Sequence, residues 1–146
     1  MSILNLNNKT LRGYISSRNI GGSFYPQSLQ NLLIRSFALD KKINLQLSAT
    51  EWNIKKSYLM LRSILNQKND GIIFFSLFQL LEDKKNFLFF SKKILKKKKI
   101  IVFCLENVVI SKQSELNLII NKIKIVKFIN NAKLKLNLKF LKKKYY

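Results

Sequence analysis

Two long runs of apolar residues constrain the fold of this chain more than any other feature. Ile72–Leu77 and Ile100–Leu105 are almost entirely apolar. Continuous runs of this length are typical of strands that are covered on both faces, as in a parallel sheet between two layers of helices. Two further strands are predicted at Leu11–Ser17 and Ile43–Leu47, each followed by small polar residues.

Amphipathic segments separate these predicted strands. Apolar residues recur at helical spacing in each of them, and Pro26 is suited to a first helical position. The spacing predicts helices over 26–39, 54–66 and 84–98, and a final helix that Ser111 or Ser114 could cap. This alternation predicts an α/β fold: a single three-layer domain with a mainly parallel, flavodoxin-like sheet of four or five strands.

The last fourteen residues differ in composition from the rest. We assign residues 1–132 to the α/β domain and residues 133–146 to a lysine-rich tail, in which Lys and Asn alternate with Leu and Phe. The alternation fits an edge strand of the sheet, but it also fits a basic amphipathic appendage. The sequence leaves both alternatives open.

The sequence has few features of an exported or membrane protein. Cys104 is the one cysteine, so no internal disulfide is expected. The first eight residues lack the apolar stretch of a secretory signal, and the longest apolar runs are far shorter than a membrane span. We therefore expect a cytoplasmic protein without a transmembrane segment.

The net charge of +21 has two interpretations. It could mark a phosphate-rich partner such as nucleic acid, an anionic surface or a nucleotide-linked substrate. It could also be compositional, because Lys, Asn, Ile and Phe all have A/T-rich codons. Only four of the 28 basic residues are arginine, whereas nucleic-acid readers favour the planar fork of arginine. Nucleic acid is therefore the less favoured partner.

Polar residues follow each predicted strand. Because the carboxyl ends of parallel strands share one edge of the sheet, and ligands bind at that edge, we expect these residues to form one site. Two carboxylates, Glu51 and Glu106, are candidates for acid–base catalysis, although each could instead cap a helix or form a salt bridge. The candidates for ligand binding are Ser16, Ser17, Arg18, Gln27, Gln30, Ser48, Thr50, Tyr58, Ser76 and Gln79.

The residue types limit the chemistry of such a site. The chain has no histidine and only one cysteine, so no metal site is predicted. It has no glycine-rich nucleotide-binding motif, and no cofactor is predicted. The hydroxyls of Ser16 and Ser17 and the guanidinium of Arg18 could hold a phosphate or a carboxylate. The sequence does not identify a reaction.

Six blocks between Gly13 and Ile110 resemble the sporadic carbohydrate cluster protein family. They include Gly13–Arg18, Pro26–Arg35, Leu47–Glu51 and Gly71–Leu80, and the remaining two are Ser57–Leu61 and Glu106. The resemblance implies a bacterial protein of surface-polysaccharide biosynthesis of the O-antigen type. We therefore expect it to bind or modify a sugar phosphate or nucleotide sugar at the carboxyl edge of the sheet. We also expect it to form a homo-oligomer or to bind a partner enzyme of the same pathway.

A fainter resemblance is to the catalytic domain of serine recombinases. Their first strand carries a Tyr-x-Arg-x-Ser motif, but here Ser16 stands where the arginine would be and Arg18 where the serine would be. The Asp-Arg pair that follows their third strand is replaced by Gln79 and Leu80. The resemblance implies a shared, resolvase-like fold without recombination. The alternative function, from the charge, is a basic module that binds nucleic acid or an anionic surface without catalysis.

Overall fold

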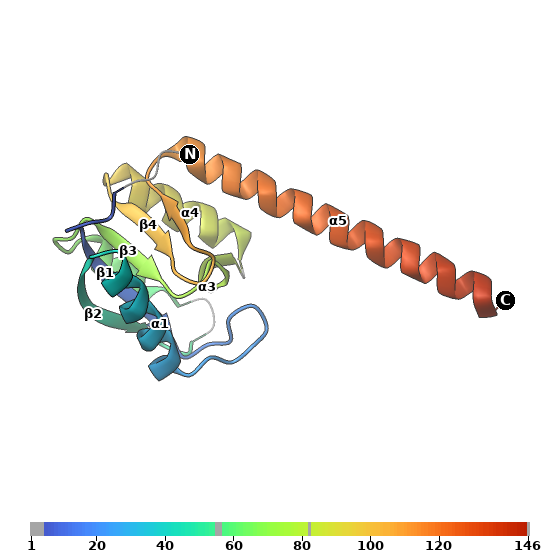
Figure 1. Cartoon of the computed structure of the whole chain (residues 1–146), viewed down its shortest axis with the longest axis horizontal. Coiled ribbons are helices and arrows are strands. Elements are labelled where there is room, and N and C mark those ends of the chain that lie inside the picture. Colours follow the sequence, from blue (N-terminus) through green and yellow to red (C-terminus); the bar gives the residue numbers. More distant parts are fainter. Residues whose placement is uncertain (1–4, 55–56, 82, 146) are drawn as a thin grey trace. The chain divides into compact units, whose positions relative to one another are not determined.

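The computed structural model describes residues 5–54, 57–81 and 83–145, with side chains up to residue 133. It contains five strands and five helices (Figure 1). The strands are β1 Thr10–Ser16, β2 Asn44–Glu51, β3 Gly71–Phe74, β4 Ile100–Phe103 and β5 Val108–Ile110. The helices are α1 Gln27–Asp40, α2 Leu59–Leu65, α3 Phe78–Leu81, α4 Lys84–Lys96 and α5 Gln113–Tyr145.

The strands form one sheet in the order β2-β1-β3-β4-β5. The first four are parallel, and β5 pairs with β4 in the antiparallel direction. This confirms the predicted α/β class and the mainly parallel sheet, and the strand order is that of flavodoxin-like sheets. The antiparallel β5 was missed because its three residues are too few to form a recognisable pattern.

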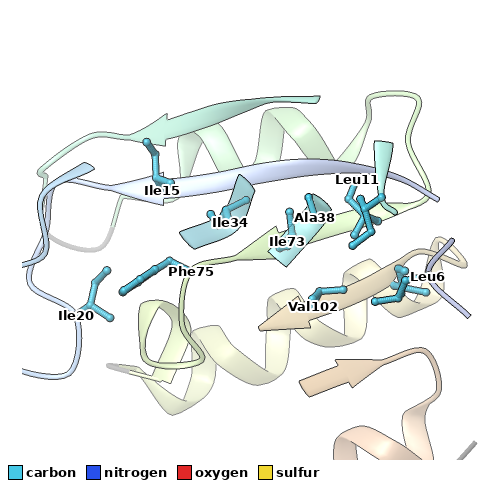
Figure 2. Packing of buried hydrophobic residues seen from close by; sticks show 11 residues of the cluster. Leu6, Leu11, Ile15, Ile20, Ile34, Ala38, Ile73, Phe75 and Val102 are labelled. Atoms are coloured by element: carbon cyan, nitrogen blue, oxygen red, sulfur yellow. The ribbon is translucent and has the colours of Figure 1, made fainter. Parts of the chain in front are cut away.

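Helices cover both faces of the sheet. On one face, Ile34 and Ala38 of α1 pack among Leu11, Ile15 and Ile73, as Figure 2 shows. On the other face, aromatic rings form a continuous layer through Tyr14, Phe74, Phe103 and Phe87, with centroid distances of 5.2, 5.4 and 6.5 Å. Phe87 belongs to α4, so the predicted three-layer arrangement is confirmed.

Several element ends differ from the sequence prediction. β2 continues to Glu51 rather than ending at Leu47, so Ser48 and Thr50 lie within the strand. α4 ends at Lys96 rather than Lys98, because Lys98 adopts a left-handed φ of 58° that stops the helix. α2 begins only at Leu59 rather than near residue 54; residues 55 and 56 lie outside the described part of the chain.

β2 contains an irregularity next to Gly13. Arg12 pairs with Gln46 and Tyr14 pairs with Ala49, so two residues of β2 lie opposite Gly13. A Cβ atom on residue 13 would overlap Ser48 Oγ and lie 3.1 Å from Ser48 Cβ. Glycine at this position therefore makes room for the bulged strand.

The chain divides into two compact units, residues 1–111 and 112–146. The second unit consists almost entirely of α5, a single helix of 33 residues. The helix continues through the tail as far as Tyr145, so residues 133–145 are not an edge strand, and the expected boundary after residue 132 falls inside α5. Tyr146 lies outside the described residues. None of the described helices is long and apolar enough to cross a membrane.

Gly71 provides a test of how closely β3 and β4 approach. A Cβ atom at this position would overlap the carbonyl oxygen of Ile100 and lie 2.9 Å from the carbonyl carbon. Because the obstacle is backbone, the strands would have to separate. We expect Gly71→Ala to lower the free energy of unfolding by about 1–3 kcal/mol in urea denaturation. Ser63→Ala, at an exposed position of α2, is the control and should not lower it; equal stability of the two variants would contradict this packing.

Candidate functional site

The strand order places the switch point of the sheet at β1, with β2 on one side and β3 on the other. In sheets of this type, ligands bind beyond the carboxyl ends of the strands, where the order reverses. Among the predicted site residues, Ser17 and Arg18 follow β1, and Ser76 and Gln79 follow β3. Their side chains were expected to form one site, so their hydrogen bonds decide which of them remain available to a ligand.

Gln30 fixes the end of β1 against α1. Its side chain is fully buried. The amide oxygen accepts a hydrogen bond from the backbone N–H of Ser16 at 3.1 Å, and the amide nitrogen donates to the carbonyl oxygens of Ser16 and Tyr25, both at 2.8 Å. Gln30 thus satisfies backbone groups of Ser16 and Tyr25. Its role is to hold the backbone, and so it offers little to a ligand.

Gln79, Ser76 and Glu106 form a similar connection at the end of β3. Gln79 accepts a hydrogen bond from the backbone N–H of Ser76 at 3.1 Å and donates to the carbonyl oxygen of Tyr14 at 3.3 Å. The hydroxyl of Ser76 donates to Glu106 Oε1 at 2.6 Å, and the backbone N–H of Leu77 donates to Glu106 Oε2 at 3.0 Å. These contacts join β1, β3 and the segment after β4.

Glu51 is buried at the beginning of α2. The hydroxyl of Tyr14 donates to Glu51 Oε2 at 2.9 Å, and the backbone N–H of Leu61 donates to the same oxygen at 3.2 Å. The N–H groups of Trp52 and Met60 donate to Oε1, both at 3.3 Å. Burial, together with the neighbouring Glu51 carboxylate, raises the pKa of Tyr14, so the phenol remains a donor.

These bonds bear on the predicted catalytic residues. Glu51 and Glu106 each accept hydrogen bonds on both carboxylate oxygens; Glu51 holds three backbone N–H groups and Glu106 holds one. Both carboxylates therefore hold backbone in place; the capping of a helix was one of the two alternatives to catalysis that the sequence left open, and a salt bridge was the other. Acid–base catalysis by this pair stays a prediction.

Arg18 has a different environment from the groups around it. It is half-buried, and its guanidinium carbon lies 4.8 Å from the centre of the Tyr58 ring. Tyr58 is itself buried against Phe90, with a centroid distance of 5.0 Å, so it forms a fixed platform. Among the described residues, no carboxylate pairs with Arg18. Ser17, also half-buried, precedes it in the chain.

A groove between α1 and β2 is lined by a second set of polar residues. Its volume is about 240 Å³. The α1 side carries Gln27, Asn31 and Arg35, which are four residues apart and so share one face of the helix. The β2 side carries Gln46, Ser48 and Thr50, and Ile15, Leu45 and Leu47 complete the lining.

The sheet separates these two regions, because Tyr14 and Glu51 lie on the α2 and α4 face, whereas Ile15 lies on the α1 face. The predicted ligand residues therefore do not form one site: Gln27, Ser48 and Thr50 line the groove, and Arg18 and Tyr58 lie together elsewhere. The sequence analysis missed Asn31, Arg35 and Gln46. The four-residue spacing of Gln27, Asn31 and Arg35 was the signal that could have identified two of them.

No group of three or more acidic or cysteine side chains that could hold a metal ion occurs within residues 5–54, 57–81 and 83–133. The chain matches no family model. Comparisons with curated proteins and with solved structures also found no match. The function must therefore be argued from the residues and their geometry.

The bond between Tyr14 and Glu51 can be tested through stability. Glu51→Gln replaces one acceptor oxygen with an amide that faces backbone N–H groups, and we expect it to lower the free energy of unfolding by about 1–3 kcal/mol. Tyr14→Phe removes a single donor and should cost less. Asp40→Asn, which alters an exposed carboxylate, is the matched control for urea denaturation. If Glu51→Gln unfolds like Asp40→Asn, then Glu51 does not hold the start of α2.

The thiol of Cys104 gives a prediction about pH. It donates to the carbonyl oxygen of Leu33 at 3.4 Å, and burial, with a smaller contribution from Glu106, raises its pKa from 9.0 to about 11. At pH 8 the thiolate fraction should be roughly a hundredfold lower than in the unfolded chain. Because the folded state holds the proton more tightly, this contribution to stability is present below pH 9 and is lost as the pH rises through 11.

The measurement is the rate of alkylation by iodoacetamide between pH 7 and pH 11, with the urea-unfolded protein as the control. The rate for the folded protein should still be rising at pH 10, where that of the unfolded chain has levelled off. A shared pH midpoint for both would show that the folded environment does not hold the proton on Cys104.

Proposed function

We propose that this protein binds a sugar phosphate in the groove between α1 and β2. The proposal places it in the cytoplasm, in the biosynthesis of a bacterial surface polysaccharide, as the resemblance of its sequence implies. The observation that carries the proposal is the chemistry of the groove lining. It combines the side-chain amides of Gln27 and Asn31 with two hydroxyls and one guanidinium, and it contains no carboxylate.

Each of these groups matches a part of a sugar phosphate. Amides and hydroxyls both donate and accept hydrogen bonds, as sugar hydroxyls do, and Gln27, Asn31, Ser48 and Thr50 supply them. A guanidinium binds a phosphate through two parallel hydrogen bonds, and Arg35 supplies it. The apolar side chains of Ile15, Leu45 and Leu47 can pack against the carbon skeleton of the ring.

Arg35 remains available for an anion. Asn31, Leu32, Ala38 and Leu39 stand three or four positions from it along α1, so no acidic neighbour on the helix competes for the guanidinium. Gln46 also lines the groove, but its side chain lies on the other face of the sheet, where its amide nitrogen donates to the carbonyl oxygen of Lys68 at 3.3 Å.

The size of the groove favours the smaller of the two expected ligands. Sites for drug-sized molecules usually measure roughly 300–1,000 Å³, and this groove is about 240 Å³. A monosaccharide phosphate fits such a volume better than a complete nucleotide sugar does. Because Glu51 and Glu106 are engaged with backbone groups, the proposal is limited to binding and includes no bond-making step.

The test uses glucose 1-phosphate as the probe, in a titration followed by amide NMR shifts. We expect the largest shifts at Gln27, Asn31 and Ser48, and UDP-glucose should bind no more tightly. Arg35→Gln should weaken binding about tenfold or more, because a charge-assisted pair is lost. Arg62→Gln, on the exposed surface of α2 and outside the groove, is the matched control and should bind normally.

Arg18→Gln tests whether the anion binds in the groove, at Arg35, or beyond the end of β1, at Arg18. Binding that depends on Arg18, with shifts at Ser17 rather than at Gln27 and Asn31, would place the anion on the Tyr58 platform and overturn the proposal. The absence of shifts at millimolar glucose 1-phosphate would also overturn it. Inorganic phosphate and glucose, titrated separately, show which half of the ligand contributes the affinity.

A further inference from the structure

α5 carries an unusual combination of charge and apolar exposure. The segment 113–146 contains nine lysines and a single acidic residue, Glu115. Its helical backbone is continuous from Gln113 to Tyr145 (Figure 1). At 1.5 Å per residue the helix is about 50 Å long. Large apolar side chains are nevertheless exposed on this basic helix.

Within residues 113–133, the part of α5 whose side chains are described, five large apolar side chains are exposed. Leu118, Ile125 and Ile129 are 58, 58 and 45% exposed and are spaced seven and four residues apart, so they form one stripe along the helix. Val126 and Phe128 flank this stripe and are 55 and 75% exposed. In the same part of the helix, Leu116 and Ile119 are buried, and they lie on a different face.

The described lysines of α5 lie both on this stripe and away from it. Lys127 lies opposite Leu118 and Ile125, on the side that Leu116 also faces, and Lys124 lies between that side and Phe128. Lys122 and Lys133 follow Leu118 and Ile129 by four residues each and so lie within the stripe. Lysines in such positions can extend their apolar stems along a hydrophobic surface and keep the ammonium group in the polar region. The helix therefore has an apolar side, which carries the stripe with Lys122 and Lys133, and a cationic side, which carries Lys124 and Lys127.

We propose that α5 docks on an anionic lipid bilayer and lies in the plane of the interface. The apolar side would enter the boundary between head groups and acyl chains, which is how basic amphipathic helices bind membranes. The lysines would be attracted to the negatively charged surface of the bilayer. Charge complementarity and apolar exposure are then satisfied by the same partner.

Other partners match only one of these features. A nucleic acid would use the lysines but would leave Leu118, Ile125 and Ile129 without a contact, and it is usually read by arginine rather than lysine. A second copy of α5 could cover the apolar stripe, but it would bring another nine lysines close to the first nine. Like charges at such an interface are unfavourable. An anionic bilayer supplies both an apolar phase and the opposite charge.

The experiment measures co-sedimentation of the full chain with vesicles. We expect binding to vesicles of phosphatidylglycerol and phosphatidylcholine in equal parts, and little binding to phosphatidylcholine alone. Ile125→Ser with Ile129→Ser should weaken binding about tenfold or more, because two large apolar side chains no longer enter the lipid. Asn117→Ser with Asn131→Ser, on the cationic side, is the matched control and should bind as the unaltered chain does.

A fluorescence measurement reports the environment of the apolar side directly. With Trp52→Phe as background, Phe128→Trp places the only tryptophan on α5. Its emission should shift to the blue when phosphatidylglycerol vesicles are added, because the indole leaves water. Far-ultraviolet circular dichroism of each variant verifies that the helix is retained, so a loss of binding is not a loss of fold.

Three results would overturn the proposal. The first is no binding to phosphatidylglycerol vesicles at low salt. The second is equal binding by the Ile125→Ser, Ile129→Ser variant and the unaltered chain, which would show that the lysines alone contact a polyanion. The third is a dimer in solution that this double variant abolishes, since a second copy would then cover the stripe. None of these results bears on the α1–β2 groove, which the variants leave unchanged.

Discussion

The sheet depends on buried side chains that hydrogen-bond the backbone where its strands end. Gln30 holds the end of β1 against α1, Gln79 links β1 to the segment after β3, and Glu51 joins β2 to the start of α2. An unsatisfied backbone group in these positions would cost about as much as a lost hydrogen bond. These side chains therefore fix the carboxyl edge of the sheet independently of any ligand. Their hydrogen bonds stabilise the fold, so they are not available to a ligand.

The fold could be predicted largely from apolar patterning. The continuous runs at β3 and β4 and the spacing within α1 and α4 located these elements to within a few residues. The ends were harder to predict, because they depend on single backbone conformations such as the left-handed Lys98, and on tertiary pairing that extends β2 through polar residues. The helical tail was undecided because alternating Lys and Leu fits a strand as well as one face of a helix.

The candidate site was predicted only in part. The rule that strand ends share an edge correctly brought Ser76, Gln79 and Glu106 together. It could not show on which face of the sheet a side chain lies, and the register of β2 places Ser48 and Glu51 on opposite faces. It also considered only strand ends, so Asn31 and Arg35, which reach the groove from the middle of α1, were outside its scope.

The bulge beside Gly13 has a consequence for the solubility of the protein. β2 is an edge strand of eight residues, and Leu47 on it is 79% exposed. A long, regular edge of this kind is a template on which a strand of another chain can pair. The additional residue at the bulge bends and twists β2 and so shortens the regular row of hydrogen-bonding groups on its free side. The irregularity that lines the groove thus also disfavours edge-to-edge aggregation.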